Sequence, residues 1–335
     1  MKILIVRVGA MGDVLHALPA VAALHVARPQ WTIDWVVDPR WAPLLVNGEG
    51  QGPAVRRVHI AETKKWTKAP ASPSTLRSVF ELRRALRAER YDLAVDMQGT
   101  LRSAVIGRMS GAAQLVGYRH PREAMAAKFY KTRLERKGAH VIEQGAALLG
   151  EACGLTLKPH AVELPHEEWA DNWAAEEVGS RRTCLLAASA GWPAKCWAPE
   201  KFGKLAAELK AMGLDVVVNA PRKDDALAAA VVAASGGAAR VVMCNVTGLV
   251  ALMRRMTLLV GGDSGPTHLA AALGIPLVAL FGPTDPQRNG PRGPGANVVL
   301  RDAASVTSYK RSNSEDAGLA RISVAAVMEA VHGLL

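Results

Sequence analysis

The sequence is poor in aromatic residues and in acidic charge. Phe, Trp and Tyr make up 5% of the 335 residues, and no run of them is interleaved with Lys and Arg. Proteins that bind single-stranded nucleic acid stack bases on such aromatic platforms, so no nucleic-acid partner is expected. Asp and Glu number 30 against 41 Lys and Arg, which leaves a net charge of +11. This excess either keeps the protein in solution or meets an acidic partner, such as a phosphorylated small molecule or an anionic membrane surface.

The sequence also lacks any cysteine pattern. None of its four cysteines forms a Cys-x-x-Cys pair or a metal-finger spacing. We therefore expect no metal site, and free or buried thiols in a reducing cytosol. The four are Cys153, Cys184, Cys196 and Cys244.

No apolar run is long enough for a secretion signal or a membrane span. The N-terminal run Ile3–Val6 is interrupted by Arg7, and the longest apolar stretch, Leu269–Phe281, is broken by Gly274 and Pro276. A span needs about 20 consecutive apolar residues, and a signal core is also longer than the N-terminal run. We expect a soluble protein that is at most peripheral to a membrane.

Short apolar runs alternate with segments of helical period through most of the chain, which predicts a parallel sheet with helices on both faces. The predicted strands are Lys2–Val8, Thr32–Val37, Tyr91–Asp96, Leu115–Gly117, Thr183–Ala188, Leu214–Val218, Leu258–Gly261 and Pro276–Phe281. The predicted helices are Asp13–Ala27, Ala139–Cys153, Pro199–Met212, Asp224–Ser235, Pro266–Leu273 and Arg321–Leu335, with the basic amphipathic segment Ser74–Arg90. A polar loop is predicted over Arg301–Asp316.

Two domains are expected from the length and from the half of the residues that are apolar. The alternation slackens at Leu157–His166, which contains Pro159 and Pro165, so the linker is placed there. The expected parts are a first domain over 1–160, a second over 161–320 and a closing helix over 321–335. Ligands of such sheets bind at the carboxyl ends of the strands, and two facing domains form a cleft between them.

A Gly-rich turn, Gly9–His16, joins the first predicted strand to the first helix. Such a turn lets the backbone approach a ligand closely, and a helix N-terminus favours anions. Asp13 has two interpretations here: an N-cap that stabilises the helix by about 1 kcal/mol, or a carboxylate that takes a proton from a substrate hydroxyl. With Asp38 after the second strand, a dinucleotide fingerprint is a weaker match, because the glycines are spaced G-x-x-G rather than G-x-G-x-x-G.

Two polar Gly-rich segments, Gly261–His268 and Phe281–Pro286, follow predicted strands of the second domain. Backbone amides of the first can cradle a phosphate with help from the helix dipole, although Asp263 could instead serve as a cap. Ser189 leaves a third strand, and Lys195 lies in the loop after it. This lysine could neutralise a departing diphosphate or be an ordinary solvated side chain. Two such exits on one sheet edge favour a ligand site.

At these residues the sequence resembles glycosyltransferase family 9, the ADP-heptose:lipopolysaccharide heptosyltransferases, over nearly the whole chain. The most specific segment is Gly262–Pro286, which contains D-S-G-P-T-H-L-A-A-A-L-G-I-P and F-G-P-T-D-P. The opening Lys2–Pro19, K-I-L-I-V-R-V-G-A-M-G-D-V-L-H-A-L-P, is nearly as specific. Lys195-x-Trp197, followed by Pro199-Glu200, is a third match.

Within the family, two segments are most similar to the heptosyltransferase I branch. These are Met11–His16 and Asp34–Val37. That branch transfers L-glycero-D-manno-heptose from ADP-heptose to the Kdo inner core of lipopolysaccharide. The resemblance therefore implies a cytoplasmic enzyme, peripheral on the cytoplasmic face of the inner membrane, with an anionic membrane surface as a further partner.

The resemblance implies an α/β GT-B fold, with two Rossmann-like domains facing a central cleft, and inverting transfer without a metal or other cofactor. It implies that Asp13 is the general base on the acceptor hydroxyl and that Lys195 holds the diphosphate. Donor-binding residues would be Ser189, Cys244, Gly262, Asp263, Ser264, Gly265 and His268. The family often places an acidic residue for the ribose after Ala220-Pro221, and here Asp224 is the candidate.

The same resemblance gives the positive charge an acceptor, a lipid that carries phosphates and acidic Kdo sugars. The candidate phosphate- and acceptor-binding residues are Gly12, His16, Lys64, Lys65, Lys68, Arg102, Arg119 and Arg122. The three lysines are expected in one polar loop. Each cation alone is an ordinary surface charge by base rate, but as a group they could bind the acidic lipid head.

Three alternatives stay open. One is a later heptosyltransferase of the same family that acts on another core sugar. A second is a nucleotide-dependent oxidoreductase, which would leave the second Gly-rich segment without a role. The third is a binding protein that keeps the nucleotide-sugar pocket without chemistry, against which the presence of both Asp13 and Lys195 argues.

Overall fold

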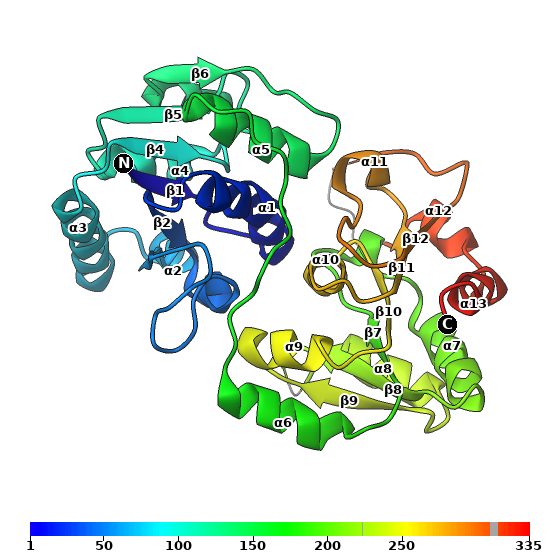
Figure 1. The fold of residues 1–335 in the computed structure, drawn as a ribbon. Helices are drawn as coiled ribbons and strands as arrows, with labels where there is room; N and C mark the ends of the chain where they lie inside the picture. Colours follow the sequence, from blue (N-terminus) through cyan, green and yellow to red (C-terminus); the bar gives the residue numbers. More distant parts are fainter. Residues whose placement is uncertain (223, 309–313) are drawn as a thin grey trace. The chain divides into compact units, whose positions relative to one another are not determined.

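The computed structural model describes residues 1–222, 224–308 and 314–335, and the chain divides into two compact units, Met1–Pro165 and His166–Leu335 (Figure 1). Each unit contains one six-stranded sheet in which every pair of neighbouring strands is parallel. The strand orders are β3-β2-β1-β4-β5-β6 and β12-β11-β10-β7-β8-β9. Numbered within its own unit, each is the doubly wound order 3-2-1-4-5-6 of dinucleotide-binding domains.

The first unit places its helices on both faces of the sheet. Its strands are β1 (Lys2–Val6), β2 (Thr32–Val37), β3 (Arg57–Ile60), β4 (Leu93–Asp96), β5 (Gln114–Tyr118) and β6 (Thr132–Leu134). Its helices are α1 (Met11–Ala27), α2 (Thr63–Lys68), α3 (Pro73–Ala88), α4 (Leu101–Met109) and α5 (Val141–Ala152), with short helices η1 (Pro39–Leu44) and η2 (Ala124–Phe129). Buried side chains of α3 and α4 share one core with β1 and β4, while α1 and α5 pack against each other (Figure 1).

The second unit repeats this plan. Its strands are β7 (Thr183–Ala187), β8 (Asp215–Ala220), β9 (Ala239–Met243), β10 (Leu258–Gly262), β11 (Leu277–Phe281) and β12 (Asn297–Arg301). Its helices are α6 (Glu168–Val178), α7 (Pro199–Ala211), α8 (Ala226–Ala234), α9 (Val246–Met253), α10 (Gly265–Ala272), α11 (Pro286–Asn289), α12 (Ala317–Arg321) and α13 (Val324–His332), with the short helix η3 (Pro193–Lys195). One core joins α7, α8 and α13 to the central strands.

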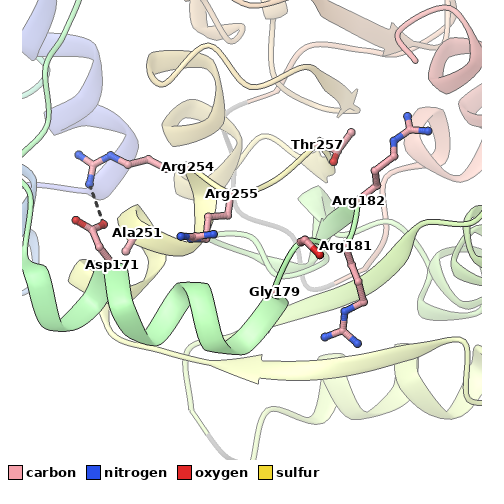
Figure 2. Close-up of a pocket in the computed structure, with 9 residues that line it drawn as sticks. Asp171, Gly179, Arg181, Arg182, Ala251, Arg254, Arg255 and Thr257 are labelled. Carbon is pink, nitrogen blue, oxygen red and sulfur yellow. Dashed lines mark ion pairs between the residues drawn. The ribbon is translucent and has the colours of Figure 1, made fainter.

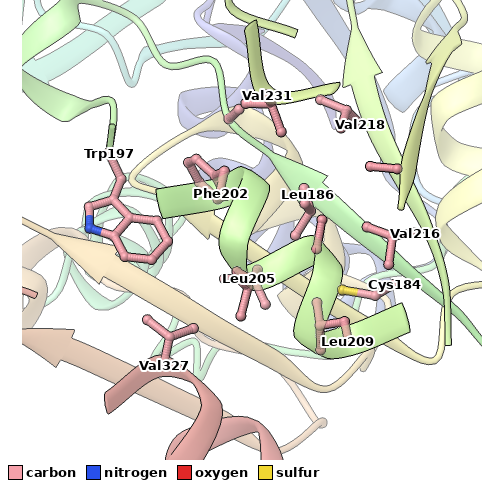
Figure 3. Close-up of a cluster of buried hydrophobic side chains, with 14 of the residues drawn as sticks. Cys184, Leu186, Trp197, Phe202, Leu205, Leu209, Val216, Val218, Val231 and Val327 are labelled. Carbon is pink, nitrogen blue, oxygen red and sulfur yellow. The ribbon is translucent and has the colours of Figure 1, made fainter. Parts of the chain in front are cut away.

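Trp197 anchors the loop after β7 to this second core. The ring is 1% exposed and packs edge-on against Phe202, with ring centroids 5.0 Å apart. Its Nε1 donates to the carbonyl of Ile322 at 3.1 Å. Figure 3 shows the indole between α7 and Val327 of α13. Because the Trp197 ring is buried and its N–H is hydrogen-bonded, the position of this residue in the core is fixed. Lys195 lies only two residues earlier, so the backbone that carries it is also fixed.

All eight predicted strands are present, with bounds within two residues of the expected ones. Two other expectations are wrong. The predicted closing helix Arg321–Leu335 begins only at Val324, where Ser323 caps α13 by accepting the N–H of Ala326 at 3.1 Å, and Arg321 is the last residue of the separate helix α12. The lysines Lys64, Lys65 and Lys68 lie on helix α2 rather than in a loop. Of the predicted loop Arg301–Asp316, Arg301 is the last residue of β12, the other described residues form no helix or strand, and residues 309–313 lie outside the described residues.

Within the described residues, no helix combines the length and the apolar character that crossing a membrane requires.

Candidate functional site

Asp13 lies in the first turn of α1, just beyond the carboxyl end of β1. The helix begins at Met11 with Ala10 as its N-cap, so of the two interpretations of Asp13 the one as N-cap residue is wrong. Its Oδ2 accepts the N–H of Ala10 at 2.9 Å, and its Oδ1 pairs with Nη2 of Arg7 at 2.6 Å. The side chain is still 39% exposed. A carboxylate has about four acceptor positions, so this one can hold its turn in place and still accept a proton.

Arg7 and Gln98 attach this turn to the end of β4. Arg7 Nη1 donates to the carbonyl of Met97 at 2.5 Å. Gln98 Oε1 accepts the N–H groups of Val8 at 2.8 Å and Gly9 at 3.3 Å. Neither residue was predicted to have a role. The sequence did contain a signal for Arg7, because it directly follows a buried apolar strand. Charged residues are rarely buried unless they are paired, so a partner for Arg7 could have been expected.

Asp96 holds the loop that carries Gln98. Its Oδ1 accepts the N–H groups of Gln98 at 2.9 Å and Gly99 at 3.0 Å. Its Oδ2 accepts the hydroxyls of Tyr130 at 2.7 Å and Ser103 at 2.9 Å. Burial raises the pKa of the Asp96 carboxyl above its ordinary value, although all four hydrogen bonds act in the opposite direction. Asp96 therefore supports the Asp13 turn from inside the core.

Gly12 and His16, both half-buried, lie on the same helix as Asp13. The His16 ring meets the His140 ring edge-on, with centroids 5.7 Å apart. His140 is fully buried and caps α5, where its Nδ1 accepts the N–H of Ile142 at 3.2 Å. His16 thus packs toward the start of α5.

The candidate acceptor cations follow the carboxyl ends of three strands of the first sheet, the edge strand β3 and the neighbours β4 and β5. Lys64, Lys65 and Lys68 are on α2 after β3, Arg102 is on α4 after β4, and Arg119 and Arg122 follow β5. All six side chains are exposed. Two have acidic neighbours, because Lys65 pairs with Glu62 at 3.3 Å and Arg119 with Glu135 at 2.6 Å. The group therefore spreads along one edge of the sheet, with part of its charge compensated.

In the second unit, Lys195, Asp263 and His268 form one cluster across the carboxyl end of β10. Lys195 Nζ forms an ion pair with Asp263 Oδ2 and lies 4.4 Å from the centre of the Trp192 ring. Nε2 of His268 lies 3.1 Å from Asp263 Oδ1. Burial alone would raise the pKa of Asp263, but the hydrogen bond and charge of His268, together with Lys195, hold it well below its usual range. The carboxylate is therefore ionised and anchors both partners.

Gly262 allows the lysine loop to reach the end of β10. A Cβ at this position would lie 2.6 Å from the carbonyl oxygen of Lys195, so any larger residue would push the loop away. Beyond it, the hydroxyl of Thr267 donates to the carbonyl of Gly262 at 2.6 Å and lies 3.2 Å from Ser264 Oγ. The N-cap Ser264 makes no side-chain cap to α10. Pro266 has no N–H, so the N–H groups of Gly265 and Thr267 lie at the positive end of the helix dipole.

Three further candidate donor residues follow neighbouring strands of this sheet. Ser189 follows β7 and is half-buried, and Cys244 follows β9, where burial raises the pKa of its thiol to about 12. Asn219 at the end of β8 donates to Cys244 Sγ at 3.9 Å. Asp224 is 86% exposed beside Arg222 at 3.8 Å, while Asp225 next to it caps α8. All of these positions are on the edge that carries Lys195; Lys223 is outside the described residues.

Comparison with known proteins gives concordant matches. The sequence model of glycosyltransferase family 9 (heptosyltransferase) matches residues 79–317. A Pseudomonas aeruginosa protein named lipopolysaccharide heptosyltransferase 1 is 29% identical over 302 residues, which cover 88% of this chain and 82% of that protein. An Escherichia coli protein named lipopolysaccharide heptosyltransferase 3 is 27% identical over 292 residues, which cover 82% of this chain and 81% of that protein.

Among solved structures, the E. coli heptosyltransferase WaaC with ADP superposes with a TM-score of 0.80 at 24% identity, and the match covers 100% of both chains. This similarity between the two structures is a similarity of fold. Together with the two doubly wound sheets, it confirms the predicted α/β GT-B fold built from two Rossmann-like units.

Proposed function

Because this chain belongs to glycosyltransferase family 9, whose model it matches over residues 79–317, we propose that it is the heptosyltransferase of the first inner-core step. Membership makes it a glycosyltransferase of the heptosyltransferase family. The proposed reaction is inverting, metal-independent transfer of L-glycero-D-manno-heptose from ADP-heptose to Kdo of the lipopolysaccharide inner core. The observation that carries the proposal is the Lys195–Asp263–His268 cluster beside the start of α10.

The cluster suits a leaving diphosphate. Transfer with inversion is a direct displacement, in which negative charge grows on the departing phosphate. The Lys195 ammonium and the amino-terminal end of α10 are preorganised positive charge at one sheet edge. Asp263 would position Lys195 rather than repel the phosphate, because its charge is already shared by Lys195 and His268. The phosphates and the sugar of the donor would be contacted by Gly262, Ser264, Gly265 and His268.

Ser189, Cys244 and Asp224 would complete the donor site. They follow β7, β9 and β8, which are neighbours in one sheet. The backbone near Cys244 would contact the adenine. The raised pKa of the Cys244 thiol keeps this side chain neutral, which suits contact with the uncharged adenine ring. Asp224 would accept a ribose hydroxyl from its exposed position.

Asp13 would accept the proton of the acceptor hydroxyl. Its two hydrogen-bonded oxygens fix the carboxylate, and its remaining lone pairs stay accessible at 39% exposure. Gly12 and His16 would contact the acceptor beside it. Peripheral attachment to the cytoplasmic face of the inner membrane, where such a lipid acceptor would be met, is part of the same proposal.

The cations of α2 give a testable acceptor contact. Changing Lys64, Lys65 and Lys68 together to Gln is expected to raise the acceptor KM about three- to thirtyfold, since each exposed charge contributes up to about 1 kcal/mol. Donor KM and kcat should not change. A matched control is the triple variant of Arg77, Arg83 and Arg84, which are exposed on α3 and carry the same total charge. Equal acceptor KM values for both variants would remove the assignment of α2.

Transfer from ADP-heptose to Kdo₂-lipid A, measured with and without EDTA, tests the proposal directly. We expect equal rates in both conditions, because the proposed charge stabilisation comes from Lys195 and backbone amides. Rates that collapse in EDTA and return with added metal would contradict metal independence.

A later heptosyltransferase step is a second candidate, because the relative named heptosyltransferase 3 is nearly as similar as the type 1 relative. The same assay separates the two candidates. Binding of ADP-heptose without transfer to Kdo₂-lipid A, but with transfer to a heptose-bearing acceptor, would favour the later step. Absence of both binding and transfer would refute both.

A further inference from the structure

The hollow in Figure 2, at the amino ends of β7 and β10, does not gather its arginines on one ligand. Its volume is about 570 Å³. Arg254 in it pairs with Asp171 at 3.7 Å, and Figure 2 shows the Arg182 side chain directed away from Arg254 and Arg255. A further ligand contact is better supported in the first unit, beside the candidate base.

A half-buried tryptophan, Trp41, lies beside the turn that carries Asp13. It belongs to η1, the short helix that follows the carboxyl end of β2. A Cβ built on Gly9 would lie 2.8 Å from Nε1 and 3.0 Å from Cδ1 of the indole, so the pyrrole edge of the ring rests on this glycine. Gly9 does not have a positive φ. The space that the indole occupies, rather than backbone freedom, therefore leaves no room for a larger residue here.

Consecutive residues of this turn connect the indole to the candidate base. Gly9 packs against the edge of Trp41, and the next residue, Ala10, donates its N–H to Asp13 Oδ2 at 2.9 Å. An acceptor hydroxyl that loses its proton to Asp13 must come within about 2.6–3.2 Å of that carboxylate. The rest of the acceptor sugar extends beyond this hydroxyl, and the indole is a neighbouring surface that the sugar can contact.

Asp38 and Arg40 hold the indole in a fixed orientation. The N–H of Asp38 donates to the carbonyl of Val8 at 2.9 Å, which ties the start of η1 to the end of β1. The buried Asp38 carboxylate accepts Nε of Arg40 at 2.7 Å and Nη2 at 2.9 Å. The Arg40 guanidinium in turn lies over the Trp41 ring, 4.9 Å from its centroid, which is within cation–π range. The ring is therefore preorganised although it is only half-buried.

The indole N–H of Trp41 has no partner within the part of the chain that the structure describes. By contrast, Nε1 of the fully buried Trp35 donates to the carbonyl of Arg7 at 2.9 Å. Indole N–H groups usually find a hydrogen-bond partner when they are buried, and tryptophans with one apolar and one polar side in contact with water are common at binding surfaces. A hydrogen-bond donor is thus available for a ligand beside the Asp13 turn.

We propose that Trp41 contacts the acceptor, and that its Nε1–H donates to an oxygen of the acceptor sugar and so orients the neighbouring hydroxyl toward Asp13. The ligand is a sugar ring with oxygens on adjacent carbons. One hydroxyl meets the carboxylate, and a second oxygen, from a hydroxyl or a sugar carboxylate, meets the indole. The inference rests on the proposed function and deepens it, because it assigns acceptor recognition to a residue for which no role was predicted.

Two variants separate the indole N–H from the ring. W41F keeps an aromatic ring without the donor, and W41H keeps a ring N–H on a smaller side chain. The matched control is W31F. Trp31 is also half-buried and lies under an arginine, Arg28, at 5.7 Å, but it precedes β2 and is therefore at the opposite edge of the sheet.

W41F is expected to raise the acceptor KM about three- to tenfold, the effect of losing one hydrogen bond, while the affinity for ADP-heptose stays the same. W41H should recover part of this loss, and W31F should match the native chain. Thermal unfolding of all variants verifies that they are folded at the assay temperature. A native acceptor KM in W41F would overturn the proposal. So would a higher acceptor KM in W41H than in W41F, since the ring would then act through its volume alone.

A binding measurement separates this inference from the proposed reaction. The full chain, with 5-fluorotryptophan at its eight tryptophan positions, is followed by fluorine NMR in the presence of ADP, so that no transfer occurs. The Trp41 and Trp31 resonances are assigned with W41F and W31F. Fully deacylated saccharides that end in Kdo or in heptose are titrated, and their binding is measured in parallel by calorimetry.

We expect the Trp41 resonance to move saturably with the saccharide that binds, while the Trp31 resonance stays in place. Calorimetric binding without any movement of the Trp41 resonance would overturn this inference and leave the proposed function standing. Absence of binding by either saccharide would overturn both.

Discussion

Asp13→Asn is expected to lower kcat by about 10²–10⁴-fold, the range that a positioned general base contributes. Asparagine has the same shape, and its carbonyl oxygen can still accept the N–H of Ala10, so the first turn of α1 should persist. What disappears is the proton acceptor and the charge that pairs with Arg7. Affinity for ADP-heptose should stay within about twofold, because the proposed donor contacts lie in the other unit.

Asp92→Asn is the matched control for this experiment. Asp92 is an exposed carboxylate at the amino end of β4, and its Oδ2 accepts the N–H of Lys2 at 2.7 Å, a bond that asparagine can also make. It removes one negative charge from the same unit, at the edge opposite to Asp13. Native kcat in Asp92→Asn together with a collapse in Asp13→Asn would support the base assignment. A kcat for Asp13→Asn within threefold of native would refute it.

Lys195→Gln is expected to lower kcat by about 10²–10³-fold, which is the usual loss when one charge-stabilising group is removed. The affinity for ADP should fall as well, because the ammonium would meet the diphosphate in the ground state too. A cost in stability is also expected: Asp263 is 7% exposed and would keep only His268, and breaking a buried ion pair costs about 3–5 kcal/mol. Kinetics and thermal unfolding should therefore be measured on the same samples.

Two further variants separate chemistry from folding. Lys195→Arg keeps the charge and the ion pair with Asp263, so its Tm should recover more than its kcat does, since a guanidinium places its charge differently. Lys204→Gln on α7 removes an exposed lysine from the same unit and should change neither quantity. If Lys195→Gln, measured below its Tm, transferred heptose at the native rate, Lys195 would be a structural residue only.

The sequence predicted the central strands well and missed every edge strand. β1, β4, β7 and β10 are buried on both faces and appear as continuous apolar runs. The missed strands β3, β6, β9 and β12 are the four edges of the two sheets. Each is short and mixes apolar with polar or charged residues, as in the Thr-Arg-Leu of β6. Edge strands face water on one side, so their local pattern does not differ from that of a loop.

The candidate site divides in the same way. The Gly-rich segments around Asp13 and Asp263 were visible in the sequence, because a backbone that approaches a ligand after a strand needs glycine locally. The contacts of these residues were not visible. Lys195 and Asp263 are 68 positions apart, and Val8 and Gly9, whose N–H groups donate to Gln98, precede it by 90 and 89 positions.

Sequence by itself therefore determined the fold class, the family and the positions of the polar strand ends, since these depend on local apolar patterning and glycine spacing. Tertiary structure decided which charges are paired. It placed Asp13 at the third helical position against Arg7, put Asp96 beneath the Gln98 loop, and paired Lys195 with Asp263 at the end of β10. Residues on different parallel strands come together only when the sheet assembles. Their separation along the sequence does not show which strands will be neighbours in the sheet.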